Sequence, residues 1–167
     1  MEVTFRPARP DDLAAIVALL ADDVLGSGRE HVGAEVDPAY VRAFEAIAAD
    51  PRQLLVVATR GEEVCGTVQV SCLPTLTHRG GERAQLEGVR VASSARGEGV
   101  GRAMVAWVVD EARRRGCRTV QLTTDRRRPD ARRFYESLGF EATHDGMKLA
   151  LPTTVPRAAT SPPQGVD

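Results

Sequence analysis

The sequence contains few of the residues that hold metal ions or close disulfides. Its 167 residues include three histidines and three cysteines, Cys65, Cys72 and Cys117. There is no C-x-x-C pair and no cluster of histidine and cysteine with zinc-site spacing, so we predict no metal. An odd number of cysteines suits a reducing compartment, and Cys65 and Cys72 stand at an odd offset that puts them on opposite faces of one strand. We expect three free thiols.

Long apolar runs and an excess of charge of one sign are also missing. No window approaches the roughly 18 consecutive apolar residues of a membrane span, and residues 1–12 lack the apolar core of a signal peptide. Lys and Arg number 22 against 23 Asp and Glu, which leaves a net charge of −1. Neither nucleic acid nor a membrane is therefore an expected partner. We predict a cytoplasmic protein with a small-molecule substrate, and a homodimer stays open.

The length fits one domain with a single core, and the hydrophobic periodicity predicts mixed α/β structure. Residues 153–167 show no periodicity and predict a disordered tail after a domain of residues 1–152. The predicted elements are a strand at 3–8, a helix from Pro10 to Val24, a helix at 38–49, strands at 54–59, 64–73 and 84–91, a helix from Val100, a strand at 119–123, a helix at 131–138, and a last strand or hairpin at 140–151 broken at Asp145 and Gly146.

The most informative segment is VRVASSARGEGVGR, Val89 to Arg102, in which closely spaced glycines open a helix. The first turn of a helix has unpaired N–H groups and a positive dipole end, and glycines let a diphosphate approach them. The third glycine comes one place too early for a dinucleotide fingerprint, and the Walker lysine is missing. The segment predicts a phosphate cradle, with a plain tight turn as the alternative. The helix itself is marked by an apolar stripe of Val100, Ala103, Met104, Trp107, Val108 and Ala112.

Two motifs in this order resemble those of the GNAT superfamily of N-acyltransferases. The R-x-x-G-x-G pattern from Arg96 to Gly101 resembles its acyl-CoA-binding motif, and DARRFYESLGF, Asp130 to Phe140, resembles its second signature. The segments LEGVRV and THDGMKL are most similar to small bacterial members, among them aminoalkylphosphonate acetyltransferases. The resemblance implies an α/β (α+β) fold, a single GNAT-like domain whose mixed, mostly antiparallel sheet is flanked by helices on both faces.

The resemblance also implies acetyl-CoA as cosubstrate and direct acetyl transfer to a primary amine of a small molecule in a ternary complex. It implies that the strand before the loop splays from its neighbour, so that backbone groups of Val89 and Val91 pair with the pantetheine arm and hold the acetyl oxygen. Arg128 stands where superfamily members often have asparagine, which weakens any role for that position. The loop residues with an implied role in binding CoA are Arg96, Gly97, Gly99, Val100, Gly101 and Arg102.

Two side chains are candidates for proton transfer. Tyr135 matches the superfamily tyrosine that protonates the departing CoA thiolate, and its alternative is aromatic packing with Phe134, although adjacent helical residues point about 100° apart. A primary amine titrates near about 10 and is mostly ammonium at neutral pH, so a base or a water relay must take its proton. Glu87 is the candidate base, with an ordinary surface glutamate as the alternative. Glu82, Glu30 and Asp23 are weaker candidates for the base, and His144 is a weaker candidate for contact with the substrate.

Two other functions stay open at this stage. Acetylation of a protein lysine or N-terminus would need a long open groove rather than a pocket. A catalytically silent CoA-binding module is opposed by the retained Tyr135 and favoured by Arg128. We expect the acceptor pocket to be lined by the loops 26–37 and 75–82, where superfamily members vary, and the resemblance suggests an aminophosphonate or a similar small amine.

Overall fold

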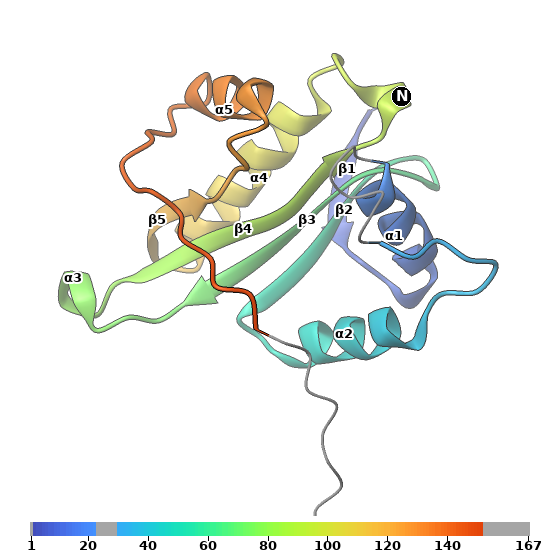
Figure 1. Cartoon of the computed structure of the whole chain (residues 1–167), viewed down its shortest axis with the longest axis horizontal. Helices are drawn as coiled ribbons and strands as arrows, with labels where there is room; N and C mark the ends of the chain where they lie inside the picture. Colours follow the sequence, from blue (N-terminus) through green and yellow to red (C-terminus); the bar gives the residue numbers. More distant parts are fainter. Residues whose placement is uncertain (1, 23–29, 152–167) are drawn as a thin grey trace, which may run out of the picture.

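The computed structural model describes residues 2–22 and 30–151, so Asp23, Val24, part of the loop 26–37 and the predicted tail at 153–167 lie outside the described residues. Within them, one sheet has the strand order β1-β2-β3-β4-β5 (Figure 1). The first four strands pair antiparallel and β4 pairs with β5 in parallel, which confirms the mixed, mostly antiparallel sheet. The strands are β1 (Thr4–Pro7), β2 (Gln53–Arg60), β3 (Glu63–Leu73), β4 (Glu82–Val91) and β5 (Cys117–Leu122).

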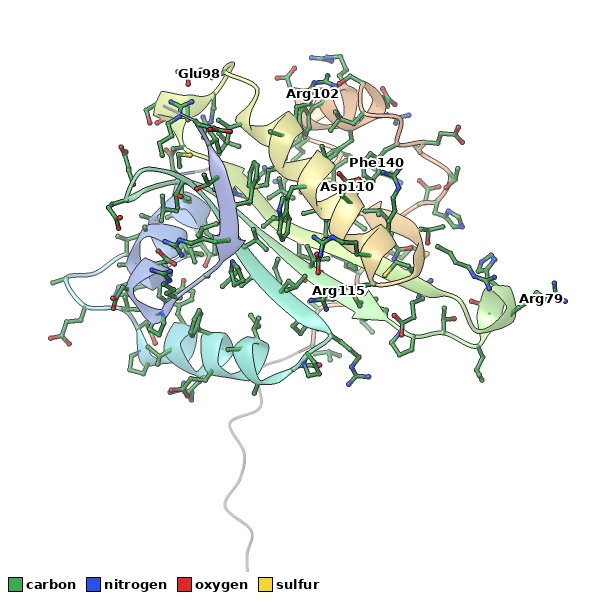
Figure 2. The ribbon with its side chains drawn as sticks, turned by 180° about the vertical axis from the view of Figure 1, so that it is seen from behind. Arg79, Glu98, Arg102, Asp110, Arg115 and Phe140 are labelled. Atoms are coloured by element: carbon green, nitrogen blue, oxygen red, sulfur yellow. The ribbon has the colours of Figure 1, made fainter. Side chains whose placement is uncertain are left out.

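Helices cover both faces of this sheet, as expected. α1 packs against β3 and β4, and α2 against β2, while α4 packs against β3, β4 and β5 from the other side. Figure 2, seen from behind, shows α4 lying across the sheet with α5 beside its N-terminal end. In chain order the helices are the 3₁₀ turn Pro10–Asp12, α1 (Leu13–Ala21), α2 (Pro38–Ala49), α3 (Thr77–Gly80), the 3₁₀ turn Ser93–Ala95, α4 (Val100–Arg114) and α5 (Pro129–Glu136).

The core lies between α4 and the sheet. Met104 and Val108 of α4 are fully buried against Val56, Val68 and Val70 of the strands. Each such side chain contributes roughly 1.5–3 kcal/mol by leaving water. The predicted stripe of α4 is largely confirmed, except that Ala103 is exposed and Val105 is buried. None of the described helices is long and apolar enough to cross a membrane.

The predicted final strand or hairpin at 140–151 is wrong. Gly139, with φ +87°, follows α5, and residues 140–151 then run without strand pairing. Met147, Leu149 and Leu151 have the alternation of a strand but are 95%, 87% and 80% exposed. Alternation shows that a segment is able to form a strand, but the ladder also needs a neighbouring strand in register, and no described strand supplies one here.

An ion pair joins β1 to the start of α1. Two guanidinium nitrogens of Arg6 donate to the Asp12 carboxylate over 2.6 and 2.8 Å, and the Arg9 amide donates to it over 2.7 Å. Asp12 is 7% exposed, so its charge depends on these donors. The Arg6 hydrogen bonds lower the pKa of Asp12, and partial burial opposes them.

We expect Asp12→Asn to lower the free energy of unfolding by about 2 kcal/mol at pH 7, because it removes a charge-assisted pair. The folded-state pKa of Asp12 is lowered, so this contribution is complete above the unfolded pKa of about 3.9 and is lost as the pH falls through the folded value. Denaturant melts from pH 7 to pH 2 should show the difference between wild type and variant vanishing at the acid end. Asp11→Asn, at the exposed neighbouring residue, is the control. An equal loss of unfolding free energy in Asp11→Asn would contradict the stabilising role of the Arg6–Asp12 pair.

Candidate functional site

Strand β4 loses its neighbour on one side halfway along its length. Its pairing with β5 ends at Leu86, opposite Leu122, whereas β4 continues to Val91. On the other side β3 stays paired up to Val91, with a shift of register between Thr67 and Gln69. Residues 87–91 therefore have a free edge with no described strand beside it, which is the splay that the resemblance implies.

Side chains instead of a strand reach the main chain along this free edge. Arg90 Nη1 donates to the Val89 carbonyl over 2.8 Å, and Arg96 Nε donates to the Val91 carbonyl over 3.2 Å. The N–H and C=O of one strand residue point to the same edge, so the amides of Val89 and Val91 also face this side. The side chains of Val89 and Val91 pack into the α4 core. Each of these residues therefore contributes its side chain to the core and its backbone groups to the free edge.

The glycine loop holds the backbone in a conformation that few other residues adopt. Gly97 and Gly99 have φ of +80° and +81°, and a Cβ added at either would meet no atom within 4 Å. The loop backbone is therefore open to solvent where α4 begins at Val100, and the first-turn N–H groups of that helix have no intrahelical partners. This open backbone fits a diphosphate.

The two arginines of the loop make structural contacts. Arg96 donates to the main-chain and side-chain oxygens of Asp22 over 3.2 and 3.3 Å, which joins the loop to the end of α1. Arg102 donates to Ser137 Oγ over 3.1 Å, and Figure 2 shows it on α4 beside α5. Neither contact tests the implied role in binding CoA, which stays a prediction.

Gly101 lies where α5 and β4 pack on the first turn of α4. A Cβ at Gly101 would lie 3.4 Å from Phe134 Cζ and 3.5 Å from Val91 Cγ2. A Cβ at this position would make ordinary van der Waals contacts, so only a larger side chain would displace Phe134 or Val91. The glycine loop, the free edge of β4 and the α5 helix therefore meet at this one point.

Helix α5 supplies Tyr135. The Tyr135 ring lies 5.1 Å from the Phe134 ring and 5.6 Å from the Phe140 ring, both edge to face. The adjacent Phe134 and Tyr135 rings therefore touch. Phe134 also packs against Gly101 of α4, where Val91 of β4 lies as well. Within the described residues, the Tyr135 hydroxyl makes no hydrogen bond and is left available to a substrate.

Electrostatics keep Tyr135 protonated. Burial raises the pKa of its phenol, and the positive charges of Arg90 and Arg128 oppose that rise. The neutral phenol is therefore present at neutral pH, with two cations able to stabilise the phenolate after a proton leaves. The sequence alone did not indicate that the charges of Arg90 and Arg128 act on the Tyr135 phenol. Only the position of Arg90 between Val89 and Val91 was a signal, because it places a cation at the same edge.

The candidate base lies on the other face of β4. Ala84 and Leu86 are buried under α4, so alternation turns Glu87 to the opposite face, where it is exposed and opposite Gln69. His144 is exposed and bonded to Thr143, and the loop 75–82 joins the start of β4, at the other end of this strand from the glycine loop. The structure therefore does not bring that loop to the free edge.

A hollow of about 340 Å³ lies between α4 and α5. Figure 2 shows Arg102, Asp110 and Phe140, which line it, along α4. It contains neither Glu87 nor the loop glycines. No group of three or more metal-ligating side chains is present in residues 2–22 and 30–151.

Comparison with known proteins agrees with this geometry. Residues 15–140 match the Acetyltransferase (GNAT) family. An aminoalkylphosphonate N-acetyltransferase from Salmonella typhimurium is 29% identical over 147 residues, which cover 87% of this chain and 90% of that protein. A Bacillus halodurans structure described as a transcriptional regulator has a TM-score of 0.88 and 49% identity, covering 90% and 100% of the two chains. A putative acetyltransferase structure from Agrobacterium tumefaciens has a TM-score of 0.78 and 29% identity, covering 89% and 99%. The chain therefore belongs to the GNAT family of acetyltransferases.

Proposed function

We propose that this acetyltransferase moves the acetyl group of acetyl-CoA directly to a primary amine of a small molecule. One observation carries the proposal: the free edge of β4, the glycine loop and the Tyr135 helix meet around Gly101. An anchored thioester, a donor for the carbonyl oxygen and a proton source are thereby within one site. The name of the Salmonella relative supports a small amine as acceptor rather than a protein. The reducing cytoplasm is the proposed location, which free thiols suit.

The loop and the free edge bind the cosubstrate in this proposal. The backbone of Gly97, Gly99 and the first turn of α4 donates to the diphosphate, while Val89 and Val91 pair with the pantetheine arm. An amide of this edge donates to the acetyl oxygen as that atom gains negative charge. A preorganised donor of this kind is worth about 3 kcal/mol in a dry site.

Two side chains move the protons. Glu87, directly or through water, takes a proton from the substrate ammonium, and the free amine then attacks the acetyl carbon. The nitrogen of the resulting tetrahedral intermediate loses its second proton to water, the carbon–sulfur bond breaks, and Tyr135 gives its phenolic proton to the departing thiolate. The charges of Arg90 and Arg128 stabilise the resulting phenolate, which regains a proton from solvent.

Thiol release with a panel of amines and peptides tests the function, and Tyr135→Phe tests the acid. We expect small primary amines to release CoA, and Tyr135→Phe to lower kcat about 10²-fold with little change in KM, because only the hydroxyl is lost. An acyl donor with a more acidic thiol should recover much of the rate. If only peptides lead to CoA release, protein acetylation is favoured. If none of the acceptors leads to CoA release, the catalytically silent CoA-binding module is favoured. Full activity of Tyr135→Phe would mean that Tyr135 serves only in packing.

Binding of acetyl-CoA at the glycine loop is testable with two matched glycines at the ends of α4. Gly99 and Gly116 have φ of +81° and +80°, and an added Cβ meets nothing within 4 Å at either. Alanine at either position should cost about 1–2 kcal/mol of backbone strain. At acetyl-CoA about 100 times its Kd, wild type and Gly116→Ala should gain about 2.7 kcal/mol of stability, whereas Gly99→Ala should gain much less. An equal gain in both variants would exclude the loop as the diphosphate site.

Glu87→Gln should lower turnover most at low pH, where the ammonium holds its proton most tightly, and much less at high pH. The measurement is the pH profile of kcat/KM for one amine. Glu82→Gln, at the start of the same strand, is the matched control. A loss that is the same at every pH, or one that appears in Glu82→Gln instead, would return Glu87 to an ordinary surface residue.

A further inference from the structure

A row of amide and hydroxyl side chains crosses the sheet on the face opposite α4. Gln53 of β2 lies opposite Ser71 of β3, Ser71 opposite Gln85 of β4, and Gln85 opposite Gln121 of β5. We call these four residues the amide row. All four point away from the α4 core, because their strand neighbours Ala84 and Leu86 fill it.

Hydrogen bonds within the amide row leave part of its capacity unused. Ser71 Oγ donates to Gln53 Oε1 over 2.7 Å, and Gln121 Nε2 donates to Gln85 Oε1 over 2.7 Å. Gln85 Nε2 reaches the Leu86 carbonyl at 3.3 Å. Within the described residues, the Gln53 amide nitrogen donates no hydrogen bond and the Gln121 amide oxygen accepts none. One donor and one acceptor are therefore unused at the two ends of the amide row.

Among the helices of residues 2–22 and 30–151, none lies over the β5 end of this face (Figure 1). Figure 1 shows α1 and α2 beside β1 to β3, whereas the segment after α5 crosses in front of β5 and β4. That segment has few ties to the sheet: the nearly fully exposed Arg126–Asp145 ion pair, at 3.2 Å, and the approach of Gly146 to Thr123. Gln85 and Gln121 are accordingly half-buried rather than packed under apolar side chains.

The amide row runs beside the candidate base. Glu87 follows Gln85 by two residues on the same face, a step of about 7 Å, and neighbouring strands stand about 4.8 Å apart. A molecule whose amine lies at Glu87 therefore meets a hydrogen-bonding side chain about every 5 to 7 Å along β4 and across to β5. Each glutamine amide both donates and accepts, as a hydroxyl does.

The row itself carries no cation. Among the described residues of β4, the cations on this face are Arg83, four residues from Glu87 and so about 13 Å away, and Arg90, three residues away on the other side, beyond the register shift at Gly88. In a short aminoalkylphosphonate the amine and the phosphorus are only about 5 Å apart, given bonds near 1.5 Å. With its amine at Glu87 and its other end along the amide row, away from Arg90, such an anion would meet neutral amides, although dianions are normally bound by arginine or lysine.

On the basis of the proposed function, we infer that the amide row binds the acceptor and selects a neutral primary amine with several hydroxyl groups, of amino-sugar size. The hydroxyls of such a molecule replace water on Gln85 and Gln121 while its amine sits at Glu87. A site built to hydrogen-bond hydroxyls discriminates strongly against acceptors that lack them, because its half-buried amides are then left unpaired.

The test compares glucosamine, 2-aminoethylphosphonate and butylamine as acceptors, using thiol release by the full-length chain. We expect glucosamine to have the highest kcat/KM. Gln85→Leu and Gln121→Leu should each raise its KM about tenfold, with less than a twofold change in kcat/KM for butylamine or in KM for acetyl-CoA. Thr119→Val, on the same face of β5 outside the row, is the matched control and should behave as wild type.

Binding is read separately from turnover by the side-chain amide NMR signals of wild type, which the two leucine variants assign. Glucosamine should shift the Gln85 and Gln121 signals. Such shifts without thiol release from any amine would support the row and contradict the proposed function. Turnover of glucosamine with unmoved amide signals, equal KM in all variants, or a preference for 2-aminoethylphosphonate would overturn the inference and leave the proposed function in place.

Discussion

The separation of β4 from β5 after Leu86 is the constraint on which the rest of the site depends. Backbone N–H and C=O groups away from water need partners, and a strand normally finds them in its neighbour. Here Arg90 and Arg96 satisfy the carbonyls of Val89 and Val91, which lets the edge stay open without a neighbouring strand. Arginine has no acceptor atoms, so it cannot satisfy the amides of the same edge. Those amides are what an acyl substrate with carbonyl oxygens would bind.

The open edge is useful only because two further elements are fixed against it. At Gly101, Phe134 of α5 and Val91 of β4 both pack on the first turn of α4, and the Phe134 ring in turn contacts the adjacent Tyr135 ring. Arg102 bonded to Ser137 gives α4 and α5 a second, polar connection. The loop, the edge and Tyr135 therefore belong to one packed unit centred on Gly101.

The sequence predicted the parts of this site that are local. The glycine loop and the helix that begins at Val100 follow from residue type and spacing over a few positions. What it did not predict depends on contacts between distant segments. Periodicity at 140–151 indicated a strand, but the register of a partner is not encoded there. The effect of Arg90 and Arg128 on Tyr135 likewise arises only when β4 and α5 pack together.

The glycine at position 101 shows the limit of reading a motif as chemistry alone. Within one motif, Gly97 and Gly99 are required by their positive φ, whereas Gly101 lies against an aromatic ring. The same residue type thus meets two physical demands, backbone conformation and close packing, within five positions. Much of the machinery is main chain, and its side chains at Val89 and Val91 serve the core. Under the proposed function, the residues beside Glu87 on the face of β4 that turns away from that core are therefore the ones that can differ with the acceptor while the contacts to the cosubstrate stay the same.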